Sequence, residues 1–329
     1  MKVGIDNYGL LPLSLTPLET LEWAVRNGAE GVAFSGIENR PLKKYSSEFL
    51  NDISGYSSDH QLYIEWGGGQ HLPWDISLLK RKDIYPMNRV VAEEAAELGV
   101  SLVRSCSGGL MRWNADGPDT QEYLSNMSKA LTQLKPVLKD LNVIWSIETH
   151  FEFTSFELID TLEEAGFYPG EEVGICLDTM NLLTMLEDPV RAAKRLLPWV
   201  VSTHIKDGGL LRYEKGLRSF PAPINKGWIN LIEIIRLLAE HNQQIDLSVE
   251  DHNGSFDLPV LNDAFIKEFP DLRTDEMNYL IHIADSAEPF RTKIENEYFN
   301  RALWPSVCEK RMHQNIIELK ELRNRIIND

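Results

Sequence analysis

Short apolar segments alternate with longer stretches of helical periodicity along most of this chain, and no other feature limits its possible folds as strongly. The later short segments are rich in β-branched and aromatic residues, which favours strands. The predicted strands cover residues 3–6, 31–36, 61–66, 101–106, 143–150, 173–178, 200–206 and 245–250. Eight strands, each followed by a helix, predict an α/β protein in which residues 1–254 form a (β/α)₈ TIM barrel.

Helix start signals agree with this alternation. Residues 16–19 and 154–157 are capping boxes, and Asp188-Pro189 combines an N-cap residue with proline at the first helical position. A doubly wound sheet of eight strands would show the same alternation. However, no G-x-G-x-x-G or Walker-type loop follows any predicted strand, so the barrel is favoured.

Residues 255–329 are predicted to form a C-terminal helical extension, because they contain no convincing strand. In the last helix, Met312, Ile316, Leu319 and Ile326 lie on one apolar stripe. This stripe could cover the chain's own barrel, which is the commoner outcome, or meet a partner chain.

The charge balance limits the partners. The chain has 329 residues with 33 Lys and Arg against 50 Asp and Glu, a formal charge of −17, so nucleic-acid binding would need a local basic patch. The three cysteines form neither an even disulfide set nor a C-x-x-C pair, which fits a reducing compartment. No apolar run approaches the roughly 18 residues of a membrane span. We expect a soluble, cytoplasmic protein with neither a nucleic-acid nor a membrane partner.

Four consecutive predicted strands end in residues that can bind a metal. Barrel enzymes carry their working groups at C-terminal strand ends, and strands five to eight place four such residues there: Glu148, Asp178, His204 and Glu250. Because side chains alternate along a strand, the residues two positions earlier should also face the barrel interior. All four of these are small: Ser146, Cys176, Ser202 and Ser248.

Three carboxylates and one imidazole in one place repel one another unless a cation joins them. Mixed oxygen and nitrogen donors with open positions suit one divalent ion: Mn²⁺, Mg²⁺ or Co²⁺, with Zn²⁺ as an alternative. The competing interpretation is a buried ion-pair network without a metal.

Further polar groups are predicted around the same site. Alternation places His150, Met180, Lys206 and His252 just above the four ligands, at the barrel mouth. Other strand ends contribute Asp6, Glu65 and Arg104. Arg104 could bind a substrate oxygen or pair with a carboxylate. The candidate substrate-binding residues are Glu65, Arg104, Lys206, His252 and Trp113.

Loop residues on that side are harder to assign. Trp66, Trp74 and Trp113 are predicted in loops, where they could stack on sugar faces or plug the barrel mouth. Residues 67–69 are three glycines without the Lys-Ser/Thr of a phosphate loop, so we interpret them as backbone beside the pocket.

His150 is the candidate acid/base. It lies on the same strand face as Glu148 and about 6–7 Å further along, and an imidazole with a pKa near 6.5 can take and return a proton at neutral pH. Alternatively, His150 only hydrogen-bonds Glu148 or a substrate hydroxyl.

With these residues in place, the chain resembles the xylose isomerase-like TIM barrels, the sugar-phosphate isomerase/epimerase superfamily, over roughly residues 1–254. The resemblance is carried by Ser-Ile-Glu148-Thr-His150, Cys-Leu-Asp178-Thr, Thr-His204-Ile-Lys206-Asp207, Asn-Lys-Gly227-Trp-Ile-Asn and Ser-Val-Glu250-Asp-His252. It implies one divalent metal, manganese first, held by Glu148, Asp178, His204 and Glu250. It also implies a carbohydrate substrate whose carbonyl the ion polarises, while His150 or a carboxylate such as Glu148 or Glu250 moves a proton through an enediolate.

Two local patterns differ from the ketose 3-epimerases of that superfamily. Thr149-His150 stands where those enzymes typically carry a proline and an Asn-Arg pair, and Asn181 stands where they tend to have a histidine. The Glu-x-His pattern and the C-terminal extension are similar instead to the catalytic subunits of C-glycoside-deglycosylating enzymes, which eliminate an aglycone from a 3-keto sugar. That similarity implies a keto-glycoside substrate and a hetero-oligomer with a small partner subunit; otherwise we expect a homo-oligomer.

Three function classes remain open. The first is a metal-dependent sugar isomerase or epimerase, or a lyase that starts from the same proton abstraction. The second is hydrolysis of DNA phosphodiesters, which needs a multinuclear zinc site, whereas the chain has only eight histidines and a strongly negative charge. The third is a non-catalytic binding subunit on the same barrel.

Overall fold

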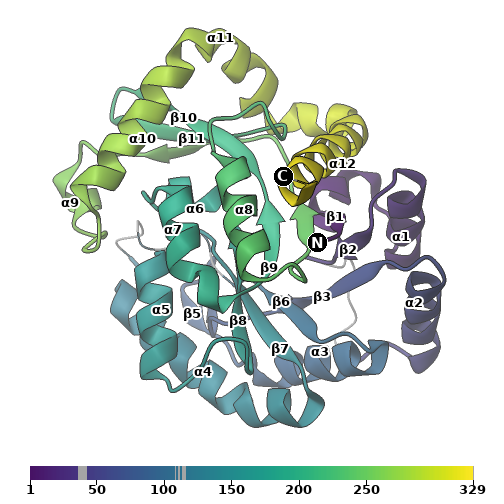
Figure 1. The fold of residues 1–329 in the computed structure, drawn as a ribbon. Coiled ribbons are helices and arrows are strands. Elements are labelled where there is room, and N and C mark those ends of the chain that lie inside the picture. The colour runs from purple at the N-terminus through teal and green to yellow at the C-terminus, as the bar shows by residue number, and fades with distance from the viewer. Residues whose placement is uncertain (36–42, 108, 110–111, 113–115, 329) are drawn as a thin grey trace.

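The computed structural model of the protein describes residues 1–35, 43–107, 109, 112 and 116–328. Eight parallel strands close into a barrel at its centre, in the order β1, β2, β3, β6, β7, β8, β9, β12 (Figure 1). Their bounds are β1 Val3–Asp6, β2 Gly31–Ala33, β3 Tyr63–Gly69, β6 Leu102–Ser105, β7 Ile144–Glu148, β8 Val173–Asp178, β9 Val200–Ile205 and β12 Leu247–Val249. All eight predicted strands and the predicted barrel are confirmed.

Helices surround the barrel. They are α1 Pro17–Arg26, α2 Ser47–Asp59, α3 Tyr85–Leu98, α4 Thr120–Leu141, α5 Ser155–Glu164, α6 Asn181–Thr184, α7 Pro189–Leu196 and α8 Leu231–His241. Four helices follow in the tail: α9 Asp263–Ile266, α10 Thr274–Ala287, α11 Arg291–Ile294 and α12 Trp304–Asn328. The capping boxes predicted at Thr16 and Thr154 are both present. No helix in the described part of the chain is long and apolar enough to cross a membrane.

The barrel interior contains the small residues that alternation predicted. The hydroxyls of Ser146 on β7 and Ser202 on β9 lie 2.8 Å apart although β8 runs between those strands, so both side chains point inward. Lower in the barrel, Tyr63 on β3 reaches Ser248 on β12 at 2.7 Å. Tyr63 packs so closely over Gly31 that a Cβ there would lie 2.0 Å from its ring. A packed interior therefore supports the strand ends from below.

A small antiparallel sheet lies beyond β9. It consists of β10 Asp207–Tyr213, β11 Gly216–Ala222 and β13 Phe256–Leu258. The prediction that residues 255–329 contain no strand is wrong at β13, and the β10–β11 hairpin was not among the predicted strands. β13 is a three-residue edge strand, too short to show an alternating pattern. A further pair, β4 Trp74–Asp75 and β5 Lys80–Arg81, follows β3.

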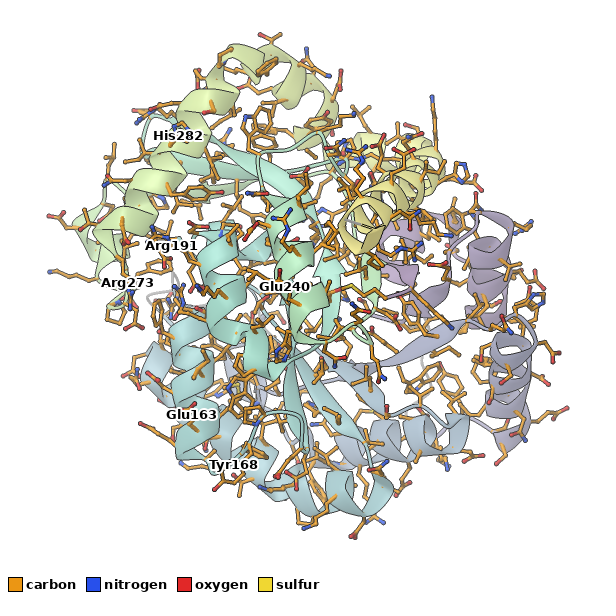
Figure 2. The ribbon with its side chains drawn as sticks, viewed as in Figure 1. Glu163, Tyr168, Arg191, Glu240, Arg273 and His282 are labelled. Carbon is orange, nitrogen blue, oxygen red and sulfur yellow. The ribbon has the colours of Figure 1, made fainter. Side chains whose placement is uncertain are left out.

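The tail packs on the chain's own barrel. Arg191 on α7, labelled in Figure 2, pairs with Asp275 in the first turn of α10. Helix α12 lies between α8 and the β1 region, and its Met312, Ile316 and Leu319 are buried in the main core. Helix α12 therefore takes the place after β12 in the ring of helices, next to the first strand (Figure 1).

Candidate metal centre

Four side chains meet at the C-terminal ends of β7, β8, β9 and β12. Glu148 ends β7, Asp178 ends β8, His204 lies in β9 and Glu250 directly follows β12. All four are buried, and one potential ligand atom from each lies within 4.8 Å of the others. Because these strands are successive neighbours in the barrel, their ends converge on one point.

The backbone after β8 orients Asp178. Its Oδ1 accepts hydrogen bonds from the N–H groups of Met180 at 3.0 Å and Asn181 at 2.9 Å. The other oxygen, Oδ2, is therefore directed at the shared centre, where Lys206 Nζ lies 3.1 Å away. Burial is the main reason that the pKa of Asp178 rises to about 6, although Lys206 lowers it.

Two threonines fix the strand ends that carry these groups. Thr149 Oγ1 accepts from Asp178 N at 2.8 Å and donates to Asp178 O at 3.2 Å. Thr179 Oγ1 repeats this arrangement one strand later, with Lys206 N at 2.9 Å and Lys206 O at 2.6 Å. These hydroxyls continue the backbone ladder where the strands end, which holds the neighbouring side chains in place.

His204 bridges the cluster. Its Nδ1 lies 2.7 Å from Glu250 Oε2 and its Nε2 lies 3.3 Å from Asp6 Oδ2. Burial lowers the pKa of His204, but the Cys176 thiol and the surrounding carboxylates raise it well above its usual range. A carboxylate hydrogen-bonded to the far ring nitrogen fixes the tautomer of a metal-binding histidine; Asp6 lies within ion-pair distance of that nitrogen here but makes no hydrogen bond to it.

Two cations compensate part of the negative charge. Arg104 pairs with Glu148, and its Nη1 donates to Ser35 O at 3.1 Å. Lys206 Nζ lies 2.7 Å from Glu250 Oε1. Burial alone would raise the pKa of Glu148, but the charges of Arg104 and His204 hold it below its usual range. Arg104 and Lys206 therefore lie at the barrel mouth and also form ion pairs with candidate metal ligands.

The cluster leaves buried polar atoms without hydrogen bonds, which tests whether a metal fits. Asp178 Oδ2, Glu250 Oε2 and both ring nitrogens of His204 lie near groups of opposite charge but make no hydrogen bond among the described residues. Buried polar atoms without hydrogen bonds are costly, and a divalent cation would satisfy the two carboxylate oxygens and one nitrogen of His204. With His204 neutral, as a metal ligand must be, the carboxylates of Glu148, Asp178 and Glu250 outnumber the cations of Arg104 and Lys206, so ion pairing with those two cations leaves charge uncompensated. The donor set therefore fits one divalent ion.

A second polar group of side chains lies beside these ligands and was missed by the sequence reasoning. Glu152 Oε2 lies 3.0 Å from His150 Nδ1, and Glu152 Oε1 lies 3.1 Å from His71 Nε2. His71 is buried, and its Nδ1 contacts Ser105 Oγ at 2.9 Å. Although burial raises it, the charges of His150 and His71 lower the pKa of Glu152 to about 2. The signal available in the sequence was the H-x-E spacing of His150 and Glu152.

The remaining candidates divide into three groups. His252 is buried at the mouth, where its ring meets Tyr8 edge-on at 5.5 Å. Glu65 lies in the barrel interior, where burial raises its pKa to about 8. Trp113 lies outside the described residues.

Two tryptophans predicted in loops lie elsewhere. Trp66 belongs to β3 and is buried, with its Nε1 donating to Glu94 of α3 at 2.9 Å. Trp74 belongs to β4 and packs edge-on against Tyr123 at 5.4 Å. The loop prediction is wrong for both. Strand β3 runs on through the three glycines to Gly69 and turns Trp66 toward the helix layer, and Trp74 begins the two-residue strand β4.

The Asn-Lys-Gly227-Trp-Ile-Asn segment supports the base of the β10–β11 hairpin. Asp207 accepts hydrogen bonds from Gly208 N at 2.8 Å and Gly227 N at 2.9 Å. A Cβ at position 227 would lie 2.1 Å from Asp207 Oδ1, so only glycine allows this approach. The segment thus anchors the residue next to Lys206.

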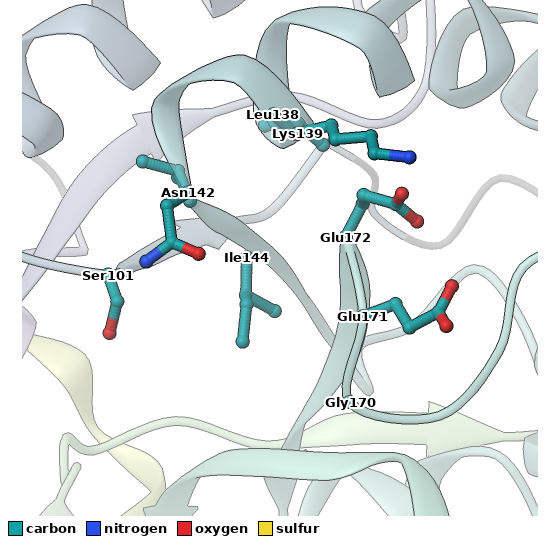
Figure 3. A pocket seen from close by; sticks show the side chains of 9 residues that line it. Ser101, Leu138, Lys139, Asn142, Ile144, Gly170, Glu171 and Glu172 are labelled. Carbon is teal, nitrogen blue, oxygen red and sulfur yellow. The ribbon is translucent and has the colours of Figure 1, made fainter.

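A cavity of about 520 Å³ lies at the opposite end of the barrel (Figure 3). Its lining includes Ser101, Ile144 and Glu172, which start or immediately precede β6, β7 and β8. It therefore opens at the N-terminal face, away from the four converging side chains. The catalytic groups of barrel enzymes lie at the other, C-terminal face.

A family description matches most of the chain. The xylose isomerase-like TIM barrel model aligns with residues 21–286. The chain belongs to this family. This xylose isomerase-like barrel carries its candidate ligands at the C-terminal strand ends, where barrel enzymes place their working groups.

The following proteins are distantly similar to this xylose isomerase-like barrel. The uncharacterized protein YihM of Escherichia coli (strain K12) is 25% identical over 97 residues, which span 30% of this chain and 29% of that protein. Among solved structures, a D-psicose 3-epimerase with D-fructose has a TM-score of 0.60 at 16% identity, covering 88% of this chain and 99% of its own. The 3-keto-D-glucoside 4-epimerase YcjR of E. coli has a TM-score of 0.58 at 15% identity, covering 83% and 99%. The zinc-containing IolI protein has a TM-score of 0.57 at 15% identity, covering 85% and 99%. At these identities, the likeness shows a shared fold.

Proposed function

We propose that this protein is a divalent-metal-dependent enzyme of the sugar isomerase/epimerase type, whose reaction begins by removing a proton from the carbon next to a sugar carbonyl. The observation that carries the proposal is the convergence of four buried donor atoms within 4.8 Å at the C-terminal end of the barrel. The shared fold with a D-psicose 3-epimerase and a 3-keto-D-glucoside 4-epimerase supports a carbohydrate substrate.

Glu148, Asp178, His204 and Glu250 are the proposed ligands. Because oxygen donors outnumber the single imidazole, manganese is the ion we favour, with magnesium and cobalt as alternatives; the zinc in the IolI structure supports zinc as a further alternative. When bound, such an ion supplies Lewis-acid polarisation of the sugar carbonyl.

His150 is the proposed base. Its Nδ1 faces Glu152, so Nε2 is the ring atom directed at substrate. The C–H bond breaks, His150 Nε2 takes the proton, and the electron pair moves toward the carbonyl oxygen. Returning that proton to the neighbouring carbonyl carbon, while the hydroxyl proton moves between the two oxygens, gives an isomerase. For an epimerase, Glu148 or Glu250 would first take a proton from a substrate hydroxyl or water and then deliver it to the opposite face of the carbon. We assign to Arg104 and Lys206, which pair with Glu148 and Glu250, the binding of the oxygen on which negative charge develops.

Metal analysis and isotope exchange test this function together. Purified protein should contain about one divalent ion per chain, whereas Asp178→Asn and His204→Ala variants should lose it. Incubation with candidate keto sugars in D₂O should place deuterium on the carbon next to the carbonyl. Undiminished metal in both variants would refute the ligand set, and conversion of a substrate without exchange would refute the proton abstraction.

A second candidate is a lyase that eliminates the aglycone from a 3-keto glycoside after the same first step. The observation that favours it is an apolar pocket of about 190 Å³ beside His252, lined by Tyr8, Leu11 and Trp304. Product analysis with 3-keto glycosides and free ketoses separates the two: release of an aglycone supports the lyase, and an isomeric sugar supports the isomerase or epimerase. A protein without stoichiometric metal would instead be the non-catalytic binding subunit.

A further inference from the structure

Three more side chains with metal-binding atoms meet beside the candidate metal centre. One donor atom from each of Cys106, His150 and Glu152 lies within 4.8 Å of the others. This set shares no residue with the four candidate ligands described above, although His150 follows Glu148 by only two positions. The barrel mouth therefore carries a second group of potential ligands, and the proposed reaction gives its cysteine no role.

The loops that carry these donors are held together without a metal. Glu152 Oε1 lies 3.1 Å from His71 Nε2, and Glu152 Oε2 lies 3.0 Å from His150 Nδ1. Ser107 Oγ accepts a hydrogen bond from His71 N at 2.5 Å, which fixes the residue after Cys106 against the loop that follows β3. Carboxylates that bind a metal are themselves hydrogen-bonded by a second group, and His71 is placed to support Glu152 in this way.

The donor types in this second group favour zinc. Thiolate, imidazole and carboxylate are the three ligand types that zinc takes in proteins, whereas thiolate is a poor ligand for Mn²⁺ and Mg²⁺. In a tetrahedral site with metal–ligand distances of about 2.0–2.3 Å, neighbouring donors lie about 3.3–3.8 Å apart. Small side-chain movements would bring the three donors to that spacing. Thiolate and carboxylate together also balance the charge of one zinc ion.

The second group is accessible to an ion from solvent. The side chain of His150 is 20% exposed, and Cys106 is half-buried. Burial and the Glu148 carboxylate raise the pKa of the Cys106 thiol well above its usual range, although Arg104 lowers it. The thiol is therefore protonated in the metal-free protein, and its proton passes to solvent when the zinc–sulfur bond forms.

A zinc ion at this position would prevent His150 from acting as a base. A neutral imidazole carries a proton on one ring nitrogen and accepts at the other. If zinc binds Nε2, the accepting lone pair is occupied. If zinc binds Nδ1, the ring proton must stay on Nε2, which then cannot accept another. Both arrangements stop proton abstraction by His150.

We propose that Cys106, His150 and Glu152 form an inhibitory zinc site that turns the enzyme off by occupying its base. The zinc site stands on its own donor atoms, but its effect on turnover rests on the proposed function. The proposal assigns Cys106 to regulation rather than to the reaction.

A cobalt titration of the chelator-treated protein tests the site by its spectrum. Co²⁺ can replace zinc, and a thiolate ligand gives it a sulfur-to-cobalt charge-transfer band in the near ultraviolet. The wild type should bind about two ions per chain and show the band. Cys106→Ser and Cys106→Ala should bind about one ion and lack the band, whereas Asp178→Asn should bind about one ion and keep it. Thermal unfolding shows whether each variant is folded.

Two further variants sharpen the titration. Cys308→Ser is the matched control and should keep the band, because the Cys308 thiol is buried in α12 and donates to Pro305 O at 3.7 Å. His71→Leu should weaken binding at the second group by about 10–100-fold, since it removes the hydrogen-bond partner of Glu152.

Chemical modification tests whether zinc blocks His150, without any substrate. Diethyl pyrocarbonate acylates unprotonated imidazole nitrogens, and peptide mass spectrometry locates the product. Zinc should abolish modification of His150 in the wild type but not in Cys106→Ser. The exposed His282, labelled in Figure 2, is the internal reference and should react in every sample.

Turnover provides the regulatory comparison. With Mn²⁺ present, added zinc should stop deuterium exchange into a keto sugar in the wild type. Cys106→Ser should exchange at the wild-type rate without zinc and keep that rate when zinc is added. Inhibition that persists in Cys106→Ser would overturn the regulatory role, because zinc would then act at the other four ligands.

The remaining outcomes separate this proposal from the proposed function. Absence of the band in folded wild-type protein, a band that Cys106→Ser leaves unchanged, or His150 modification that zinc does not alter would overturn the zinc site. Binding of a single ion that depends on Cys106 and not on Asp178 would support the zinc site and refute the proposed function.

Discussion

Lys206 places an ammonium group among the carboxylates that a metal would also use. Its Nζ lies 3.1 Å from Asp178 Oδ2 and 2.7 Å from Glu250 Oε1. In metal-free protein its positive charge therefore reduces the repulsion between these two buried carboxylates. Once an ion is bound, the same positive charge opposes it.

Replacing Lys206 should consequently move stability and metal affinity in opposite directions. Lys206→Met should destabilise the metal-free protein by about 3–5 kcal/mol, because it strands buried charge, and should strengthen Mn²⁺ binding. Urea unfolding with and without Mn²⁺ and a Mn²⁺ titration measure both quantities. Lys226→Met, at an exposed position, is the control. Equal stability of the Lys206 variant and wild type without metal would contradict this role.

His150 and Glu152 should act as one unit. His150→Gln should keep fold and metal while turnover falls by about 10²–10⁴, and Glu152→Gln should lower turnover by about 10–100-fold through loss of orientation. In the double variant, Glu152→Gln should add little, because its effect passes through His150. The rate of deuterium exchange measures all three. Glu163→Gln, at an exposed position labelled in Figure 2, is the matched control. Fully additive effects on turnover would show that His150 and Glu152 act independently.

Glu65 gives the metal-free protein a pH-dependent stability. Burial raises its pKa from 4.5 to about 8, so between these values the folded protein keeps a proton that the unfolded chain has lost. The free energy of unfolding should therefore fall as pH rises through this window, by at most about 1.4 kcal/mol per pH unit. The Glu65→Gln variant should lack this component. Urea unfolding of both proteins at about pH 5, 6.5 and 8 tests this effect of Glu65. It would be ruled out if the difference in unfolding free energy between the two proteins stayed constant across that range.

At the level of elements, the strands were predictable and the connections were not. The ends of β7, β8, β9 and β12 could be aligned from sequence because one face of each strand repeats every two residues, and Ser146 and Ser202 lie inward as that rule requires. The contact between His71 and Glu152 depends on the loops after β3 and β7, which have no such period. The β10–β11 hairpin also lies in a connection between barrel strands without a regular period, so it was not predicted.

Variants in helix α12 test whether the C-terminal tail contributes to the stability of the barrel. Leu319 is fully buried, whereas Ile317 on the same helix is 38% exposed. Leu319→Ala should lower the free energy of unfolding by about 2–5 kcal/mol, and Ile317→Ala by less than about 1 kcal/mol. Chemical denaturation of both variants provides the comparison. Similar losses would show that α12 contributes no more than a surface helix.

On the scale of the whole molecule, the two ends of the chain are joined. Met1 N donates to Gln243 O at 2.6 Å, and Arg323 Nη1 on α12 donates to Met1 O at 3.0 Å. The N and C labels of Figure 1 accordingly lie near each other. The sequence indicated that the stripe on the last helix is apolar, but more than fifty residues separate β12 from α12. No local pattern could show that this helix returns to stand beside β1.

This return has a consequence for the order of events during synthesis. Val3 pairs with Leu247, so at roughly 5–20 residues per second the first strand waits about 12–50 s on the ribosome for its neighbour. Helix α12, which buries Met312 and Leu319 against the same region, emerges later still. Closure of the sheet and docking of α12 are therefore late, long-range steps, which are slow to nucleate. Until then the edge of β1 lies open, and the nascent chain is at its most vulnerable to pairing with other chains.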